Sequence, residues 1–204
     1  AGSVQLFLLC YGSETTMTGA EGGFRSPDWY IERALTEETA KLSTDEGHKK
    51  ASIAFFNWVQ KENVSSILDV GCGDGWMVSQ FFERGYQAHG VTLRENEVIP
   101  RIRNSVYIQD MHTFDALSYG PWSAIWCRHT LEHALAPYVV MMNFRRHLMD
   151  GCKLYVVLPG PGWDTMPLHY SPMTVGQFLA LAHKTGFEPR NYSTVYVKGL
   201  GAPE

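Results

Sequence analysis

One segment in the first half of the chain constrains the fold more than any other. It reads Ile67-Leu68-Asp69-Val70-Gly71-Cys72-Gly73-Asp74-Gly75-Trp76. An apolar run ends in three alternating glycines, and a helix-forming run begins directly after them. Glycine permits the unusual dihedrals of a tight turn and the close approach of a ligand, and the first turn of a helix carries unpaired N–H groups that suit an anion. The segment therefore predicts a strand, a ligand-binding loop and a helix.

Beyond this loop the sequence alternates between strand and helix patterns. Strands are expected over 64–70, 87–93, 105–109, 122–127, 153–158 and from 187 onward; helices are expected over 76–84, 95–102, 113–119, 137–149 and 171–186. Alternation at this spacing is typical of a parallel sheet with right-handed crossovers. We therefore expect an α/β fold: a Rossmann-like, doubly wound, mostly parallel sheet with helices on both faces.

The chain of 204 residues suits one compact domain with a short appendage. Residues 1–26 are rich in Gly, Ser and Thr, and we expect a flexible N-terminal arm there. Residues 27–62 are expected to form an N-terminal helical lid, with one helix over about 27–42 and a second that ends near Lys61. Residues 63–204 would form the ligand-binding core.

Charge and cysteine content limit the partners of this chain. A net charge of −4 and a pI near 6.1 disfavour nucleic acid and anionic membranes as partners. The apolar run Leu6 to Tyr11 is too short to span a bilayer. The four cysteines form no CxxC pair, which argues against a zinc ribbon and favours a reducing, cytoplasmic setting. The oligomeric state is left open.

The spacing of the glycines disfavours two common nucleotide-binding loops. A dinucleotide-binding GxGxxG loop has glycine where this sequence has Trp76, and an indole there would obstruct close packing of the helix. The GxxxxGK[ST] pattern of a P-loop is absent. A nucleotide-dependent oxidoreductase is therefore a minor alternative.

The segment instead resembles motif I of the class I S-adenosylmethionine-dependent methyltransferases, (V/I)LDxGxGxG, and the resemblance extends from about Asn63 to Phe187. It implies S-adenosylmethionine as cofactor and methyl transfer to a small-molecule acceptor. By this resemblance Gly71, Cys72 and Gly73 would line the methionine part of the cofactor. Asp69 would accept hydrogen bonds at the strand end, and Trp76 is an aromatic candidate for the sulfonium.

Two later strand ends carry further candidates. Most of the family has an acidic residue at the position of Thr92, but Thr92-Leu93 followed by Glu97 resembles the GxTLSxxQ variant of the cyclopropane-fatty-acid synthase branch. The resemblance places these three residues near the ribose; the alternative for Glu97 is a solvated helix position. Asp110 and Met111 occupy the family's adenine-binding positions, and the alternative for Asp110 is a helix N-cap.

The string that follows the strand over 122–127 contains His129-Thr130-Leu131-Glu132-His133 and resembles the LEHxxxP string of small-molecule methyltransferases. The resemblance implies that carbonyls near Cys127 and Arg128 receive the methionine ammonium. His129, His133 and His169 are the candidate bases, with no choice among them. The string also spells HxxEH, a zinc-peptidase pattern. Because it leaves a buried strand, we expect no long metal-binding helix and no metal.

The family's sheet normally ends in an antiparallel pair of strands, yet few residues follow Gly186. We therefore expect the last antiparallel strand to be missing or short. A degenerate protein that binds S-adenosylmethionine without transferring its methyl group is the main alternative function.

Overall fold

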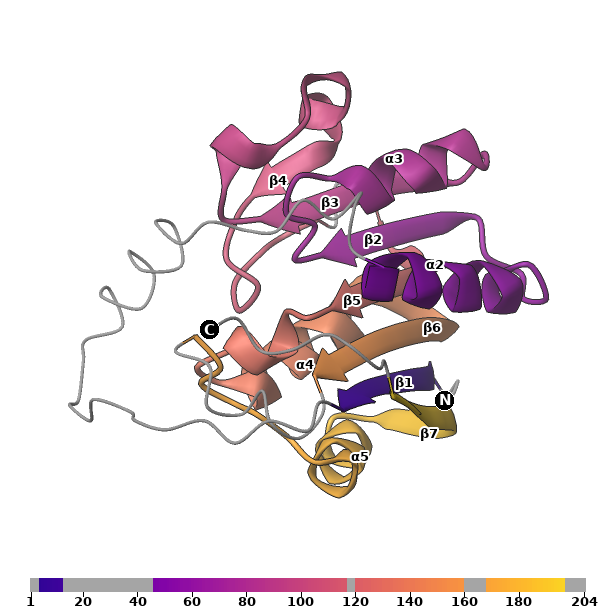
Figure 1. Ribbon diagram of the computed structural model, residues 1–204, viewed down its shortest axis with the longest axis vertical. Helices are drawn as coiled ribbons and strands as arrows, with labels where there is room; N and C mark the ends of the chain where they lie inside the picture. Colours follow the sequence, from indigo (N-terminus) through magenta and orange to yellow (C-terminus); the bar gives the residue numbers. More distant parts are fainter. Residues whose placement is uncertain (1–3, 13–45, 117–119, 160–167, 197–204) are drawn as a thin grey trace.

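The computed structural model describes residues 4–12, 46–116, 120–159 and 168–196. Its centre is a seven-stranded sheet in the order β4-β3-β2-β5-β6-β1-β7 (Figure 1). All six neighbouring pairs are parallel, which confirms the α/β prediction. The strands are β1 (Val4–Gly12), β2 (Ser66–Val70), β3 (Gln87–Thr92), β4 (Val106–Ile108), β5 (Trp122–Arg128), β6 (Leu148–Pro159) and β7 (Phe187–Tyr196).

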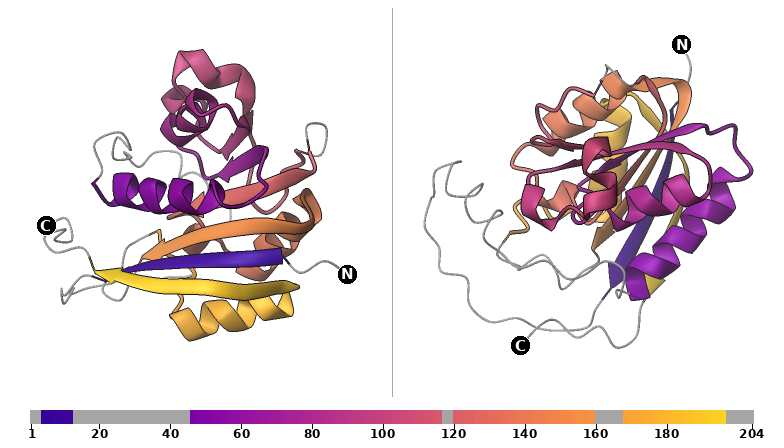
Figure 2. Two further views of the ribbon diagram at one scale, coloured as in Figure 1. Left: turned by 90° about the vertical axis from the view of Figure 1, so that its right-hand side faces the viewer. Right: turned by 90° about the horizontal axis from the view of Figure 1, so that it is seen from above.

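Helices cover both faces of the sheet, as predicted (Figure 2). One hydrophobic cluster joins the sheet to α2 and α3, and a second joins its other face to α4 and α5. Within the described ranges, no helix has the length and apolar character needed to cross a bilayer. The helices are α2 (Glu46–Val59), α3 (Trp76–Glu83), α4 (Pro137–His147) and α5 (Val175–Lys184), with 3-10 turns η2 (Glu95–Glu97), η3 (Pro100–Ser105) and η4 (Leu131–His133).

The N-terminal segment differs from the prediction. Val4–Gly12, expected as part of a flexible arm over 1–26, forms strand β1 inside the sheet. Its Leu8 is paired with Val156 of β6 on one side and Tyr192 of β7 on the other. A nearly continuous apolar run suits a parallel strand with neighbours on both sides. We expected the last antiparallel strand of the family's sheet to be missing or short; among the described residues this edge is formed by the parallel pair β1 and β7. The rest of the arm lies outside the described residues.

Helix α2 is the described part of the predicted lid over 27–62. The ring of Phe55 lies 5.0 Å from that of Trp126 on β5 and 5.2 Å from that of Tyr155 on β6, measured between centroids. This helix therefore packs on a sheet face. The predicted helix over 27–42 lies outside the described residues.

Helix α5 starts later than predicted. Thr174 caps it, with Gln177 completing the capping box. Ser171, at the start of the predicted range, donates its hydroxyl to the Ala134 carbonyl at 2.7 Å. Residues 111–116 form turns and irregular structure in place of the expected helix near 113–119.

Candidate functional site

The site lies where β2 and β5 end side by side. From this point the strand order runs β2, β3, β4 in one direction and β5, β6 in the other, and such a switch point is where open α/β sheets bind ligands. Gly71 has a φ of +82°, and a Cβ there would lie 2.0 Å from Oγ1 of Thr130. The glycine loop and the loop after β5 are therefore in contact, and only glycine fits between them.

Four backbone N–H groups in and after the glycine loop, those of Gly71, Cys72, Gly75 and Trp76, have partners within the protein. Those of Gly71 and Cys72 donate to the Val91 carbonyl of β3 at 2.8 and 3.0 Å. The Trp76 N–H donates to Oδ1 of Asp74 at 2.8 Å. The expectation that the first turn of this helix offers its N–H groups to a ligand anion is therefore wrong for Trp76. The Trp76 side chain is half-buried and packs against the cluster under α2 and α3.

Asp69, at the end of β2, is a buried acid. Only 2% of it is exposed, and burial raises the pKa of its carboxyl well above the usual value. The charge of Asp74 raises that pKa further, while the charge of Arg128 lowers it. A carboxyl in this environment is stabilised in its charged form when a cation is placed beside it. The ammonium group of an amino acid ligand is such a cation.

Cys72 and Cys127 flank Asp69 at the ends of β2 and β5. Both are free and buried, and burial raises the pKa of each thiol well above its usual value. A thiol held in its neutral form is a poor nucleophile. These cysteines therefore shape the site by packing.

The segment after β3 is held against the glycine loop. The Thr92 hydroxyl accepts from the Arg94 N–H at 3.3 Å, and the Ile99 N–H donates to the Asp74 carbonyl at 3.0 Å. Glu97 forms an ion pair with Arg94 at 2.8 Å, and 28% of the Glu97 side chain is exposed. Burial, opposed by the Trp76 hydrogen bond, raises the pKa of Asp74, and the Glu97 charge raises it further. Glu97 therefore faces the loop and is not simply a solvated residue; Leu93 beside it is half-buried.

Asp110 follows β4 and forms a turn. Its Oδ1 accepts from the His112 N–H at 2.7 Å and is bonded to Nδ1 of the same histidine. This side-chain hydrogen bond, opposed by burial, lowers the pKa of Asp110. His112 Nε2 in turn accepts from the Ala136 N–H at 3.3 Å. Asp110 is therefore part of a turn that joins β4 to the start of α4, and Met111 packs on the cluster under that helix.

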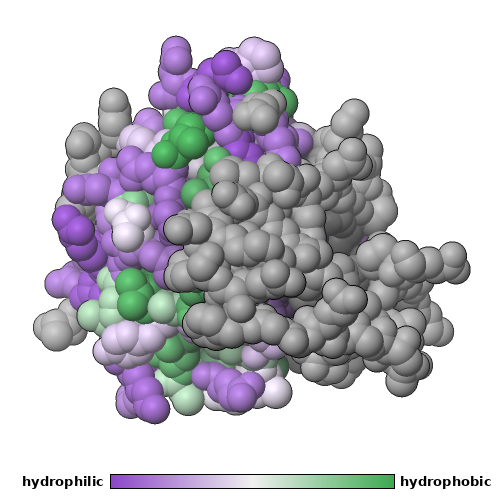
Figure 3. Space-filling model, turned by 90° about the vertical axis from the view of Figure 1, so that its left-hand side faces the viewer, coloured by the Kyte–Doolittle hydropathy of each residue, from purple (hydrophilic) through white to green (hydrophobic). Residues whose placement is uncertain are grey.

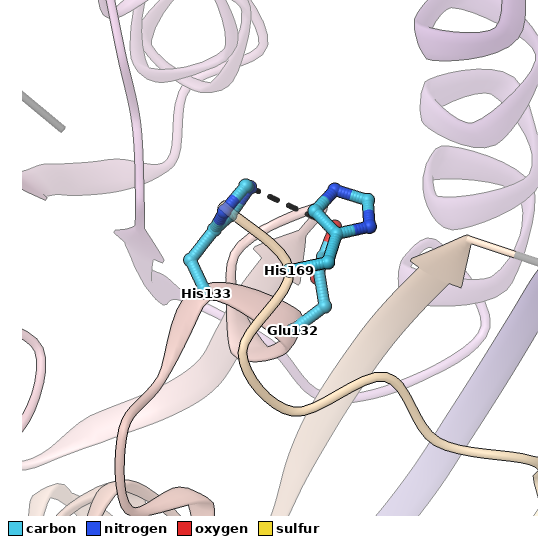
Figure 4. Close-up of side chains that lie close together, drawn as sticks. All are labelled: Glu132, His133 and His169. Atoms are coloured by element: carbon cyan, nitrogen blue, oxygen red, sulfur yellow. Dashed lines mark ion pairs between the residues drawn. The ribbon is translucent and has the colours of Figure 1, made fainter. Parts of the chain in front are cut away.

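The three candidate bases lie around one glutamate, and Figure 4 shows two of them, His133 and His169, beside Glu132. His129, at a φ of +47°, has Nδ1 3.2 Å from Oε1 of Glu132. His133 has Nδ1 2.8 Å from the Leu168 carbonyl, and its ring lies edge-on to that of His169, with 4.9 Å between centroids. Because η4 is a three-residue 3-10 turn, the zinc-peptidase alternative, which needs a long helix, is excluded.

Glu132 is the functional candidate that sequence reasoning missed. It is fully buried, and its Oε2 has no hydrogen-bond partner among the described residues. Burial raises its pKa, but the hydrogen bond with His129 and the charges of His129, His133 and His169 outweigh burial, so that the pKa is lowered. The HxxEH pattern includes Glu132, but the pattern does not predict that this side chain is buried, because its burial depends on contacts with residues distant in the sequence.

The strands end at the face shown in Figure 3. The described atoms of this face are mostly hydrophilic, with small apolar patches between them.

Comparisons with known proteins agree with this geometry. A family model described as a methyltransferase domain matches residues 30–191. A comparison with curated proteins returned no match.

Several solved structures share the fold. Magnesium protoporphyrin IX methyltransferase from Synechocystis, with bound S-adenosylmethionine, has 14% identity and a TM-score of 0.54, over 80% of this chain and 82% of that one. Phosphoethanolamine N-methyltransferase 2 from Haemonchus contortus, in complex with phosphomonomethylethanolamine and S-adenosylhomocysteine, has 19% identity and a TM-score of 0.56, over 68% and 37%. The [4+2]-cyclase SpnF has 18% identity and a TM-score of 0.52, over 67% and 58%.

The residues present fit S-adenosylmethionine in two respects. The buried carboxyl of Asp69 would be stabilised in its charged form by the ammonium group of the cofactor, and Gly71 lets the glycine loop contact Thr130 at the switch point. The family model covers most of the chain and includes every described strand end of the site. The chain therefore belongs to the methyltransferase-domain family and is a class I methyltransferase that uses S-adenosylmethionine.

Proposed function

We propose that the protein transfers the methyl group of S-adenosylmethionine to a small-molecule acceptor, with His129 as the base. The observation that carries this proposal is the histidine-lined strand end around buried Glu132, in contact with the glycine loop through Thr130. The net charge of −4 argues against a nucleic acid acceptor. Two similar structures are named for small-molecule substrates, protoporphyrin and phosphoethanolamine, which supports the same class here.

When bound, the cofactor supplies a methyl group on a positively charged sulfur. In one displacement the acceptor forms a bond to the methyl carbon, the carbon–sulfur bond breaks with its electron pair going to sulfur, and the acceptor proton passes to a base. The chain contributes alignment, exclusion of water and that base. Glu132 Oε1 accepts from Nδ1–H of His129, which fixes the tautomer with a proton-accepting Nε2. Glu132 is therefore a positioning residue.

The cofactor would lie across the ends of four neighbouring strands, β4, β3, β2 and β5. We propose that Asp69 and the carbonyls of Cys127 and Arg128 hold its ammonium group, while Glu97 and Asp110 bind its ribose and adenine. Burial of Asp69 and the approach of Glu97 to the glycine loop support these roles. The remaining contacts would come from Gly71, Cys72, Gly73, Trp76, Thr92, Leu93 and Met111.

Binding without methyl transfer is the second candidate. The likeness to a protein named as a [4+2]-cyclase shows that this fold also serves another reaction, so the fold alone does not decide between the two candidates. An incomplete sheet no longer supports it, since β1 lies between β6 and β7. We further propose a reducing, cytoplasmic setting, which the free Cys72, Cys127 and Cys152 support.

Calorimetric titration with S-adenosylmethionine and NAD, side by side, tests the proposal. We expect the wild type to bind S-adenosylmethionine and not NAD. Glu97→Gln should bind S-adenosylmethionine more weakly, whereas Glu95→Gln, which changes an exposed residue, should bind it as the wild type does. A screen of small acceptors should then yield S-adenosylhomocysteine, and His129→Ala should lower kcat about 10²–10⁴-fold while keeping cofactor affinity. Binding of NAD alone would overturn the proposal. Cofactor binding with no product from any acceptor would favour the second candidate.

A further inference from the structure

Glu132, His133 and His169 form a cluster with the composition of a metal site. One ligand atom from each of the three side chains lies within 4.8 Å of the other two. Glu132 and His133 belong to η4, directly after β5, and His169 belongs to the segment that precedes α5 (Figure 4). The HxxEH pattern would use His129 and His133 as zinc ligands, whereas in the structure the ring of His133 lies beside that of His169.

The two segments that carry the cluster are fastened to each other by hydrogen bonds. The Ser171 N–H donates to the Glu132 carbonyl at 2.9 Å, and the Ser171 hydroxyl donates to the Ala134 carbonyl at 2.7 Å. The third contact joins His133 Nδ1 to the Leu168 carbonyl at 2.8 Å. A site whose ligands come from two segments needs such support, because its geometry is otherwise set by loop motion.

The hydrogen bond to Leu168 fixes the tautomer of His133. A carbonyl only accepts, so Nδ1 carries the hydrogen and Nε2 presents a lone pair. Histidine ligands of metals usually have their second nitrogen bonded to a carbonyl or carboxylate in this way. His133 Nε2 lies 4.0 Å from Oε1 of Glu132, too far for a hydrogen bond.

Glu132 supplies the second, independent observation. It is fully buried, and its Oε2 has no hydrogen-bond partner among the described residues. A buried carboxylate oxygen without a partner is costly unless a ligand or a cation satisfies it. Its Oε1 is bonded to His129, in the manner of the outer-shell hydrogen bonds that orient metal-binding carboxylates.

We propose that Glu132, His133 and His169 bind one divalent transition-metal ion, and that this ion holds an oxygen atom of the methyl acceptor. Two imidazoles and one carboxylate suit zinc, iron or cobalt better than magnesium, which prefers oxygen ligands. Three protein ligands leave coordination positions open for a substrate. Thr130, two residues before Glu132, touches Gly71, which places the ion beside the cofactor loop.

The acceptor is then a hydroxyl, phenol or enol; this part rests on the methyl transfer proposed above. A bound metal ion lowers the pKa of a coordinated oxygen acid. The acceptor O–H gives its proton to His129, which is not a ligand. The oxygen then forms the O–CH3 bond as the S–CH3 bond breaks with its electron pair going to sulfur.

Cobalt binding to the chelator-treated, tag-free full chain tests the site without any acceptor. We expect one equivalent of Co²⁺ to bind, with the visible absorption of a histidine-ligated ion, and Zn²⁺ to displace it. His133→Ala, His169→Ala and Glu132→Gln should each weaken binding at least ~10-fold. His183→Ala, which removes an exposed histidine at the end of α5, is the matched control and should bind like the wild type. Circular dichroism confirms that each variant is folded.

The two proposals fail in different ways. No binding of Co²⁺ or Zn²⁺ by the folded wild type, or equal loss in His183→Ala and His169→Ala, overturns the metal site even if methyl transfer is found. Metal binding that depends on the three ligands, in a protein that does not bind S-adenosylmethionine, supports the site and refutes the proposed function. Methyl transfer to hydroxyl acceptors that stops with chelator and returns with Zn²⁺ or Co²⁺ supports both.

Discussion

The contact between Gly71 and Thr130 gives the sharpest test of the site. In Gly71→Ala, the new Cβ would lie 2.0 Å from Oγ1, 2.5 Å from Cγ2 and 2.7 Å from Cβ of Thr130, and φ would stay at +82°. The left-handed backbone costs about 1–2 kcal/mol for a residue other than glycine. Overpacking adds about 1–3 kcal/mol. Moving the Thr130 hydroxyl breaks its 3.0 Å hydrogen bond to the Arg128 carbonyl, which adds about 0.5–1.5 kcal/mol.

The variant should therefore lose about 2.5–6.5 kcal/mol of its free energy of unfolding. Gly85→Ala is a matched control, because Gly85 has nearly the same φ, +83°, and nothing within 4 Å of the added Cβ. It should lose only about 1–2 kcal/mol. For a domain of this size, the difference between the variants corresponds to roughly 5–15 °C in Tm.

Urea unfolding and cofactor titration of both variants make the measurement. Gly71→Ala should bind S-adenosylmethionine more weakly than the wild type, while Gly85→Ala should bind equally well. The double variant Gly71→Ala/Thr130→Gly removes the whole side chain that the new methyl group meets, so it should recover part of the loss. Equal destabilisation by the two alanine variants, with no recovery in the double variant, would show that the loops are not in contact and refute the reasoning.

Two further predictions concern the buried acid and the added strand. Because the folded-state pKa of Asp69 is raised, the stability that this carboxyl contributes is present below its unfolded pKa and is lost as pH rises through the folded value. Asp69→Asn should therefore gain Tm relative to the wild type as the pH is raised from about 4, and parallel Tm profiles would contradict this. Leu8→Pro removes an N–H from a strand with neighbours on both sides and should lower the free energy of unfolding by at least ~2 kcal/mol. The control Val4→Pro changes the first residue of that strand and should lower it less. Equal effects in urea unfolding would mean that β1 is not held in the sheet.

Local patterns in the sequence determined most of the core. The strand–glycine–helix segment from Ile67 to Trp76 predicted β2, the loop and α3, because apolar runs, glycines and helix starts depend on neighbouring residues. The alternation that follows predicted a parallel sheet with helices on both faces, since parallel strands require crossover connections. The family resemblance followed from the same segment, and the family model matches residues 30–191.

Tertiary structure alone decided the place of β1 and the composition of the site. Val4–Gly12 pairs with β6 and β7, more than 140 residues away. A short apolar run predicts a strand but does not predict which strands it will pair with. His169 meets Glu132 across 37 residues, and Gly71 meets Thr130 across 59, because strands distant in sequence end at one edge of a parallel sheet. The sequence determines which residue types are present and their local spacing. The burial of the site residues and their hydrogen-bond partners are determined only when the sheet assembles.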